Sequence, residues 1–282
     1  MQLIDGKSLA SKIQSQITQD VIKLKESKNI TPGLAVILVG DDAASHSYVK
    51  MKAKACKDVG FYSIVHEMPS SISQEEIIAT ISMMNQNPRI DGILVQLPLP
   101  KHIDTTKIIE VIDPKKDVDG FHPYNVGRMM TGLESFVACT PLGVMKLFEE
   151  YNIDLQGKDV CVVGASNIVG KPMANLLVNA NATVTVAHIY TKDLASHTKN
   201  AYIVIVGTGV RGLIKEDMVK EGAVVIDIGF NRLENGSIVG DVDFANVSKK
   251  CSYITPVPGG VGPMTIAMLL SNTFDAAQKR DI

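Results

Sequence analysis

Residues 160–177 read VCVVGASNIVGKPMANLL, and this stretch decides the fold class of the second half of the chain. Apolar residues typical of a buried strand run into Gly164, and an amphipathic helix opens near Gly170. The first N–H groups of such a helix lack partners and carry the positive end of its dipole, so they suit a phosphate. A dinucleotide turn spelled GxGxxG would have its second glycine where Ser166 stands. By itself, the stretch predicts either a cofactor-binding turn or a plain strand-to-helix turn.

Two later strand ends favour the cofactor-binding interpretation. The sequence GTGVRG follows the apolar run YIVIV, and DIGFNR follows AVVI. Open α/β sheets bind their ligands beside the carboxyl ends of parallel strands, which is where these glycines fall. The repeated order of strand and helix has the rhythm of a Rossmann domain, so we predict a dinucleotide crevice.

The choice of dinucleotide depends on the end of the strand ATVTVAH. NAD-specific folds place an acid there to hold the ribose hydroxyls, and the first acid after this strand is Asp193. The missing acid favours NADP. Three basic residues nearby are candidates to meet its additional phosphate: Lys171, His188 and Lys192.

The first half of the chain predicts a second α/β domain. Apolar residues recur at helical spacing from Leu9 to Leu24, and the strand-like run LAVILVG follows Pro32 and Gly33. A helix over SHSYVKMKAKACKDVG, a strand at YSIVHEM, and a helix with an SQEE capping pattern come next. The buried strand GILVQ is stopped by two prolines. This alternation predicts βαβ units and a mainly parallel sheet.

The composition favours a globular protein that acts on small molecules. The chain has 282 residues, and its formal charge of −2 gives no basic excess for nucleic acid or an anionic membrane. The four cysteines contain no CxxC pair, so neither a metal site nor a disulfide framework is predicted. The first residues lack a signal-peptide pattern and no apolar run reaches the length of a membrane span, so we expect a cytoplasmic protein.

The first half also contains polar residues that could form a site. Tyr48 and Lys52 lie four residues apart on a predicted helix, where a tyrosine can stack on a planar substrate and a lysine can carry protons. The alternative is a surface lysine beside a half-buried tyrosine. Gln96 interrupts an apolar strand and needs a partner or a site. Asp117 and Asp119 lie in a turn that could be a solvated Asx turn or could bind the N–H groups of a heterocycle.

Six motifs in order, SYVKMKAKAC, DGILVQLPLP, PKKDVDGFHPYNVGRM, CTPLGV, VVGASNIVGKPMA and TPVPGGVGPMT, resemble one family. They are similar to the bifunctional methylenetetrahydrofolate dehydrogenase/cyclohydrolases in the bacterial form, over nearly the whole chain. The resemblance implies that 5,10-methylenetetrahydrofolate is oxidised to 5,10-methenyltetrahydrofolate with NADP, and that the product is hydrolysed to 10-formyltetrahydrofolate. It implies an oxidoreductase and hydrolase of one-carbon metabolism that needs no metal.

The resemblance also implies an architecture. An N-terminal three-layer α/β domain, residues 1–138 and 259–282, would bind folate and carry the catalytic residues. A Rossmann-type NAD(P)-binding domain, residues 139–258, would be inserted into it, and the C-terminal helix would return to the first domain. Family members are usually homodimers through the cofactor domain.

Residue roles follow from the same resemblance. Lys52 would be the catalytic lysine and Gln96 its hydrogen-bonded neighbour. Tyr48 would pack on the aromatic part of the folate, and Asp119 would bind the pterin. The folate site would further be lined by a loop that contains Gly260, Val261, Gly262 and Pro263.

The resemblance assigns cofactor contacts in the second half. Gly164, Ala165 and Ser166 would meet the cofactor phosphates, Thr140 would lie in the crevice, and Phe230 would lie near the nicotinamide. Many relatives carry an arginine where Ala165 stands and an arginine or serine where Ile189 stands. These departures at the adenosine phosphate leave NAD usable as well as NADP.

Two rival functions use part of the same pattern. Another two-domain Rossmann dehydrogenase with a catalytic lysine, such as a shikimate dehydrogenase, gives no role to VQLPLP or KDVDG. A non-catalytic dinucleotide-binding protein would keep the glycine turns but has no need to keep Tyr48, Lys52 and Gln96 together.

Overall fold

The structure is a computed structural model that describes residues 1–280. The described chain forms two compact units, which we name by their sheets. The three-stranded unit contains Lys12–Arg128, Glu134–Val137 and residues 266–280, and the six-stranded unit contains Met1–Ser11, Met129–Leu133 and Ala138–Thr265. Helix α1 (Gly6–Lys28) and helix α10 (Val261–Gln278) each contribute residues to both units.

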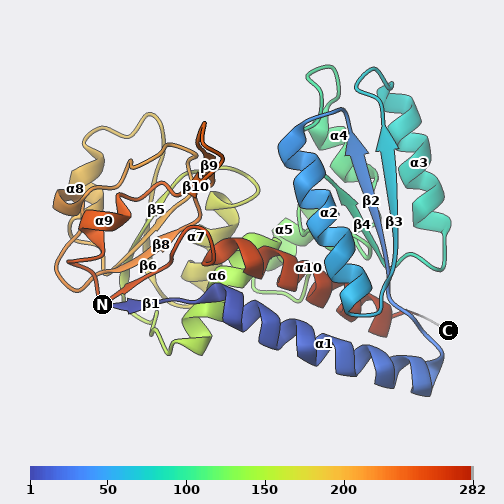
Figure 1. Ribbon diagram of the computed structural model, residues 1–282, viewed down its shortest axis with the longest axis horizontal. Coiled ribbons are helices and arrows are strands. Elements are labelled where there is room, and N and C mark those ends of the chain that lie inside the picture. Colours follow the sequence, from blue (N-terminus) through green and yellow to red (C-terminus); the bar gives the residue numbers. More distant parts are fainter. Residues whose placement is uncertain (281–282) are drawn as a thin grey trace. The chain divides into compact units, whose positions relative to one another are not determined.

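The three-stranded unit is built on a parallel sheet with the order β3-β2-β4 (Figure 1). Its elements are β2 (Gly33–Val39), α2 (Ala43–Asp58), β3 (Tyr62–Met68), α3 (Gln74–Gln86), β4 (Gly92–Val95), α4 (Thr105–Val111) and α5 (Pro123–Met130). Every residue of β2 and β4 is buried, as expected for a parallel sheet covered on both faces.

Helices cover the sheet through apolar side chains at helical spacing. Ile77 and Ile81 of α3 are fully buried in one cluster with Ile37 and Ile93 of the sheet. Burying an isoleucine side chain contributes about 1.5–3 kcal/mol. Helix α2 packs against β2 and β3, and Figure 1 shows α2 and α3 beside these strands.

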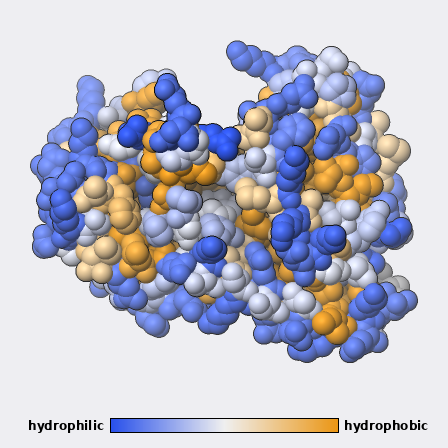
Figure 2. Space-filling view, in the orientation of Figure 1, coloured by the Kyte–Doolittle hydropathy of each residue, from blue (hydrophilic) through white to orange (hydrophobic). Residues whose placement is uncertain are grey.

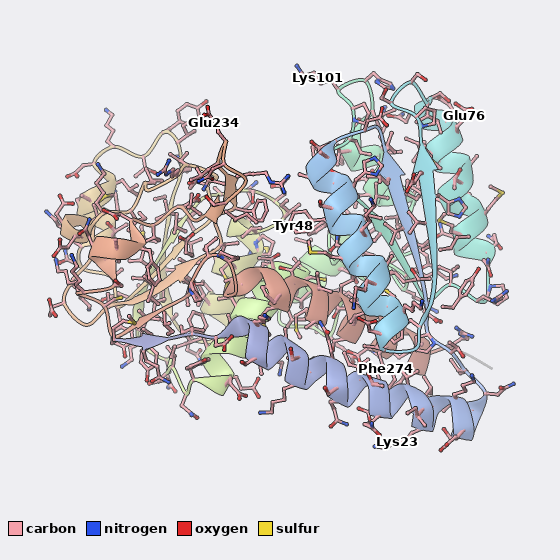
Figure 3. All side chains as sticks on the ribbon, in the orientation of Figure 1. Lys23, Tyr48, Glu76, Lys101, Glu234 and Phe274 are labelled. Carbon is pink, nitrogen blue, oxygen red and sulfur yellow. The ribbon has the colours of Figure 1, made fainter. Side chains whose placement is uncertain are left out.

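The predicted capping pattern at the start of α3 is confirmed. The Ser73 side chain accepts a hydrogen bond from the N–H group of Glu76, whose carboxylate accepts one from the N–H group of Ser73. Figure 3 labels Glu76 at this end of the helix. Two donors that a helix start leaves without partners are thereby satisfied.

The six-stranded unit contains a parallel sheet with the order β1-β11-β8-β7-β5-β6. Its strands are β1 (Gln2–Leu3), β5 (Asp159–Val163), β6 (Thr183–Ala187), β7 (Ile203–Val206), β8 (Val224–Asp227) and β11 (Tyr253–Ile254). A separate antiparallel pair joins β9 (Asn231–Arg232) and β10 (Ile238–Val239). Its helices are α6 (Cys139–Glu150), α7 (Gly170–Asn179), α8 (Leu194–Thr198), the short η1 (Glu216–Met218) and α9 (Phe244–Val247).

The strand order contains the reversal that defines a Rossmann crevice. Strand β5 lies between β6 and β7, so the chain moves to one side of β5 first and to the other side afterwards. Ligands of open α/β sheets bind at this switch point, beside the carboxyl ends of the strands. The turns after β5 and β7 therefore mark the expected position of a dinucleotide.

The N-terminal residues join the six-stranded unit, an arrangement that the sequence pattern did not indicate. Strand β1 pairs with β11, and the Lys7 N–H group donates to the Gly259 carbonyl at 2.9 Å. A Cβ atom at Gly6 would lie 1.9 Å from the Gly260 oxygen, so only glycine fits there. The first residues of the chain are thereby tied to the glycine-rich segment that precedes α10.

The C-terminal helix returns to the three-stranded unit, as predicted. The Asn272 side-chain amide donates to the carbonyls of Val118 and Val137, at 2.9 and 3.1 Å. Beyond the helix, Arg280 makes two hydrogen bonds to the buried carboxylate of Asp91, which also accepts from the Gly33 N–H group. These contacts join the end of the described chain to the starts of β2 and β4.

The surface is a mixture of hydrophilic and apolar residues. On the face seen in Figure 2, hydrophilic residues cover much of each unit, with apolar residues exposed in patches between them. Within residues 1–280, none of the helices has both the length and the apolar composition that a membrane span requires.

Candidate functional site

Helix α2 presents the two site residues that its sequence spacing predicts. The Asp42 side chain caps this helix by accepting from the Ser45 N–H group at 2.7 Å. Lys52 is only 8% exposed, and its ammonium nitrogen Nζ lies 3.1 Å from Oε1 of Gln96. The interpretation of Lys52 as an ordinary surface lysine is therefore wrong.

Gln96 lies one residue beyond β4, which corrects its predicted place inside the strand. Its main-chain N–H group donates to the Ile37 carbonyl at 2.9 Å, and its side-chain Nε2 donates to the Leu97 carbonyl at 2.8 Å. The second bond directs Oε1 toward Lys52. The glutamine thus joins a main-chain anchor to the lysine, which explains a polar residue in this apolar segment.

Tyr48 lies one helical turn before Lys52 on α2, where Figure 3 labels it. The side chain is half-buried, and this burial raises the pKa of the Tyr48 phenol above its ordinary value. The phenol is consequently protonated at neutral pH and offers an uncharged ring face together with a hydroxyl donor.

Asp117 and Asp119 have different environments, although the sequence analysis gave both residues the same two interpretations. The Asp117 carboxylate is buried and accepts hydrogen bonds from the N–H groups of Phe121 and His122 and from the Asn125 side chain. Burial raises the pKa of Asp117 to about 6. Asp117 therefore holds the turn itself, and the half-buried Asp119 is presented on that turn.

The turn after β5 has the backbone that a phosphate site requires. Gly164 adopts a φ of 121°, which disfavours any side chain, and a Cβ atom at Gly170 would lie 2.0 Å from the Gly164 oxygen. Helix α7 can therefore start directly against the end of β5. Within residues 1–280, the N–H groups of Ser166, Asn167 and Ile168 donate to no protein acceptor, so the turn offers donors that fit a pyrophosphate.

Ser166 uses its hydroxyl oxygen as a helix cap in this turn. The oxygen accepts from the N–H groups of Val169 and Gly170, at 3.2 and 3.4 Å. These two hydrogen bonds satisfy N–H groups at the start of α7, so the serine acts as a cap of this helix. Ala165 precedes it, half-buried, in the same turn.

The segment after β6 carries the residues predicted to face the adenosine end of the cofactor. Ile189 is 92% exposed in a tight turn in which His188 and Thr191 exchange hydrogen bonds. The Asp193 carboxylate accepts from the Ser196 N–H group at 3.3 Å and so caps α8. The first acid after β6 thus serves a helix, in agreement with the sequence argument for NADP.

The remaining predicted residues all belong to the six-stranded unit. Thr140 lies in the first turn of α6, and its hydroxyl is 2.8 Å from the hydroxyl of Thr265. Phe230 follows β8 and is 43% exposed. Gly260 immediately precedes α10, whereas Val261, Gly262 and Pro263 form the first turn of that helix rather than a loop, which corrects the sequence prediction.

Two buried acids, Asp227 and Asp241, escaped the sequence analysis. Asp227 is 3% exposed at the end of β8, and Asp241 is fully buried after β10. Burial raises the pKa of Asp227 to about 6. An acid that ends the apolar run AVVID was the available signal, because a buried carboxylate needs dedicated partners.

Comparison with known proteins assigns both halves of the chain to one family. The model described as tetrahydrofolate dehydrogenase/cyclohydrolase, catalytic domain, matches residues 4–119, and the corresponding NAD(P)-binding domain model matches residues 138–281. The chain belongs to the tetrahydrofolate dehydrogenase/cyclohydrolase family. The predicted family and the α/β class with a Rossmann-type NAD(P)-binding domain are confirmed.

Individual members of the tetrahydrofolate dehydrogenase/cyclohydrolase family are similar over their whole length. A bifunctional protein FolD of Sulfurovum sp. is 78% identical over 99% of this chain and 100% of the relative. The crystal structure of the Campylobacter jejuni FolD methylenetetrahydrofolate dehydrogenase/cyclohydrolase is 57% identical, covers 100% of both chains and has a TM-score of 0.98. The Trypanosoma brucei enzyme, solved with NADP cofactor and inhibitor, is 38% identical over 98% of this chain and 97% of that chain, with a TM-score of 0.95.

Proposed function

We propose that the chain is a bifunctional folate enzyme. It oxidises 5,10-methylenetetrahydrofolate to 5,10-methenyltetrahydrofolate with NADP and hydrolyses this product to 10-formyltetrahydrofolate. The observation that carries the proposal is the buried Lys52 bonded to Gln96, in a chain whose two halves match the catalytic and NAD(P)-binding domains of the family. The shikimate-dehydrogenase-like alternative also uses a catalytic lysine, but it gives no role to VQLPLP, the segment that contains Gln96.

Lys52 is the proton carrier of the hydrolytic step in this proposal. The methenyl cation is already electrophilic, so water adds to its carbon and loses a proton. The bond from this carbon to N5 then breaks as the added hydroxyl loses its proton and N5 gains one, which leaves the formyl group on N10. A lysine nitrogen held by the neutral Gln96 amide, with no carboxylate in that bond, can accept or relay these protons. The bond from Gln96 to the Leu97 carbonyl keeps the acceptor oxygen, and therefore the lysine nitrogen, in place.

Folate binding is assigned to individual residues on the family resemblance. Tyr48 offers a half-buried ring that suits the aromatic part of the folate, and Asp119 offers a carboxylate that can accept from the N–H groups of the pterin. We assign a further contribution to the segment Gly260, Val261, Gly262 and Pro263 at the start of α10.

Cofactor binding is assigned to the six-stranded unit. When bound, NADP accepts the hydride from the methylene carbon of the substrate. Gly164, Ala165 and Ser166 form the turn that would hold its phosphates, and Ile189 would lie at the adenosine end. Thr140 and Phe230 are proposed to line the rest of the crevice. The match to the NAD(P)-binding domain and the NADP complex of the T. brucei relative support NADP as the cofactor.

We further propose the functional division of the chain and its setting. Residues 1–138 and 259–282 form the folate-binding catalytic domain, and residues 139–258 form the dinucleotide-binding domain. The four cysteines are buried, and we propose a reducing, cytoplasmic setting for the chain. A homodimer through the cofactor domain is proposed on the family resemblance, and sedimentation analysis would test it.

The replacement Lys52→Met tests the catalytic assignment. Because the amine would be lost without loss of side-chain volume, hydrolysis of methenyltetrahydrofolate is expected to fall by about 10²–10⁴-fold while NADP binding persists. Hydrolysis is followed by the loss of methenyl absorbance, and NADP affinity by calorimetry. Lys50→Met, on the exposed side of the same helix, is the matched control. Full hydrolytic activity in Lys52→Met would exclude this role for Lys52.

Cofactor preference is tested by initial rates with NADP and NAD at equal concentrations. Residues 188–192 contain no acid that could hold the ribose hydroxyls, and Asp193 caps α8. NADP is therefore expected to give the higher kcat/KM. A lower but measurable rate with NAD is expected because Ala165 and Ile189 supply no positive charge. A higher kcat/KM with NAD would overturn the preference without affecting the assigned reaction.

A further inference from the structure

Asp227 and Asp241 form a connected structure at the carboxyl edge of the six-stranded sheet. Both carboxylates are buried, at 3% and 0% exposure, and they come from the end of β8 and from the residues after β10. Taking a carboxylate out of water is costly unless hydrogen-bond donors surround it. The identity of those donors shows what the two acids hold together.

Asp241 binds the loop after β7 to the β9–β10 hairpin. Its Oδ2 atom accepts from the N–H group and the hydroxyl of Thr208, at 2.6 and 2.9 Å, and from the Gly209 N–H group at 2.9 Å. Its Oδ1 atom accepts from the side-chain amide of Asn231 at 2.8 Å. One carboxylate therefore fixes two segments that are separate in the sequence.

Asp227 in turn holds the main chain of Asp241. Its carboxylate accepts from the N–H groups of Gly229, Asp241 and Val242, at 2.8, 3.0 and 2.9 Å. The main-chain N–H group of Asp227 donates to the Thr255 hydroxyl oxygen at 2.7 Å, so the position of Asp227 is set by the segment after β11. The two acids act in series, with Asp227 fixing Asp241 and Asp241 fixing the loop after β7.

The adjoining glycines are required by this arrangement. A Cβ atom at Gly240 would lie 1.9 Å from Oδ2 of Asp227, and one at Gly229 would lie 2.3 Å from Oδ1 of Asp241. Neither glycine has a φ in the left-handed region, so close approach rather than backbone conformation explains them. The sequence pairs Gly229-Phe230 and Gly240-Asp241 thus have one common cause.

The loop that Asp241 fixes borders the phosphate turn. Strands β5 and β7 are neighbours at the switch point, and a Cβ atom at Gly164 would lie 2.5 Å from the Gly207 oxygen. In a Rossmann domain the adenosine ribose lies at the end of the strand equivalent to β6, on the other side of β5. The other half of a dinucleotide must then extend from the phosphates toward β7 and β8.

We propose that Asp227 and Asp241 are positioning residues for the nicotinamide half of the cofactor. They hold Thr208 and Gly209 as the wall opposite the turn 164–169 and fix the residues on either side of Phe230, so that this half of the crevice is shaped before the cofactor binds. The inference rests on the proposed function, since it requires that the wild-type chain bind a dinucleotide.

The test compares the whole cofactor with its adenosine half. Dissociation constants for NADP and for adenosine 2′,5′-bisphosphate are measured by calorimetry on the full chain and on Asp241→Ala, Asp241→Asn and Asp243→Asn. Asp243 is the matched control because it lies two residues from Asp241 and its carboxylate accepts from the nearby Asn246 side chain, at 2.7 Å. Asn at position 241 keeps the size of aspartate but presents an N–H₂ group to one of its two sets of donors.

The expected result is a selective loss. NADP should bind at least tenfold more weakly to Asp241→Ala and Asp241→Asn, while the bisphosphate stays within twofold of the wild type and Asp243→Asn changes neither. Equal weakening of both ligands, or unchanged NADP binding in folded Asp241→Asn, would overturn the positioning role. Should Asp241→Ala fail to fold, Asp241→Asn decides. If the wild-type chain binds the bisphosphate and NADP has the same dissociation constant, the nicotinamide half contributes no affinity. That result would instead overturn the proposed function.

Discussion

At the residue scale, the proposed site contains a lysine whose hydrogen-bond partner carries no charge. Lys52 is buried on α2, and the acceptor that reaches its nitrogen is the amide oxygen of Gln96. A carboxylate in this position would form an ion pair with the lysine, whereas the neutral amide oxygen orients the nitrogen through a hydrogen bond alone. Orientation with exchangeable protons is what a relay to water requires.

The buried Asp117 predicts a pH dependence of stability. Its pKa is raised by burial to about 6, so between about pH 4 and pH 6 the folded chain keeps a proton that the unfolded chain has released. This contribution therefore favours folding at the acid end of the window and is lost as the pH rises, by about 3 kcal/mol for a shift of about two pKa units.

Asp117→Asn tests this assignment, because the amide cannot titrate. The free energy of unfolding in urea is measured for both proteins from about pH 4.5 to pH 7.5. The difference between wild type and variant should move in favour of the wild type as the pH falls, and should be constant above about pH 7. A difference that is independent of pH throughout would show that Asp117 titrates normally in the folded chain.

At the element scale, close contacts of glycines decide how strands meet helices and loops. Gly170 lets the first turn of α7 lie against the end of β5, which in turn leaves the donors of Ser166, Asn167 and Ile168 to an anion. The same geometry could not be inferred from the GxGxxG pattern, because the second glycine of that pattern is Ser166, whose hydroxyl caps the helix. A serine at this position is compatible with a phosphate turn.

Gly170→Ala is expected to destabilise the chain and to weaken NADP binding. The added Cβ atom would lie 2.0 Å from the Gly164 oxygen, so α7 must move away from β5, at a cost of about 1–3 kcal/mol. Gly127→Ala in α5 is the matched control, since its Cβ meets no atom within 4 Å of it. The control should gain about 0.5–1 kcal/mol from helix propensity. Urea unfolding compares the two, and equal stabilities would contradict the packing argument.

At the scale of the whole molecule, the two units have separate sheets and the cofactor is assigned to one of them. Ligand binding to the folded state stabilises it by about 2.7 kcal/mol at a concentration of 100 Kd. NADP alone is therefore expected to slow amide hydrogen exchange in the turn 164–169 and at Thr208 and Gly209. Exchange in β2 and β4 serves as the internal control. Protection confined to the three-stranded unit would contradict the cofactor assignment.

Local sequence patterns anticipated the elements that have a clear period. The strand Gly33–Val39, the helix Gln74–Gln86 and its Ser73 cap follow from apolar spacing and capping residues. Strands β1 and β11 did not, because two residues contain no period and their pairing joins distant parts of the chain. The start of α10 was also missed, since the glycines and prolines of PGGVGP favour a loop when judged locally.

In the candidate site, too, local patterns predicted some features, and contacts between distant residues could not be predicted from them. The spacing of Tyr48 and Lys52 indicated a shared helix face, and the isolated Gln96 indicated a need for a partner. That Lys52 and Gln96 are partners was implied by the family resemblance, because 44 residues separate them. The network of Asp227 and Asp241 depends on donors from three separate loops, and no local pattern specifies such donors.

The attachment of the N-terminal residues has a practical consequence for protein engineering. Strand β1 pairs beside β11, and Lys7 and Gly6 contact the glycine-rich segment before α10. A fusion partner or affinity tag joined rigidly ahead of Met1 would be attached directly to the edge strand β1. The neighbouring strand, β11, is followed in the chain by the proposed folate-binding residues at the start of α10. Enzymologists who trim or extend this end should expect altered Michaelis constants for folate, and a flexible glycine-serine spacer is the prudent choice for expression vectors.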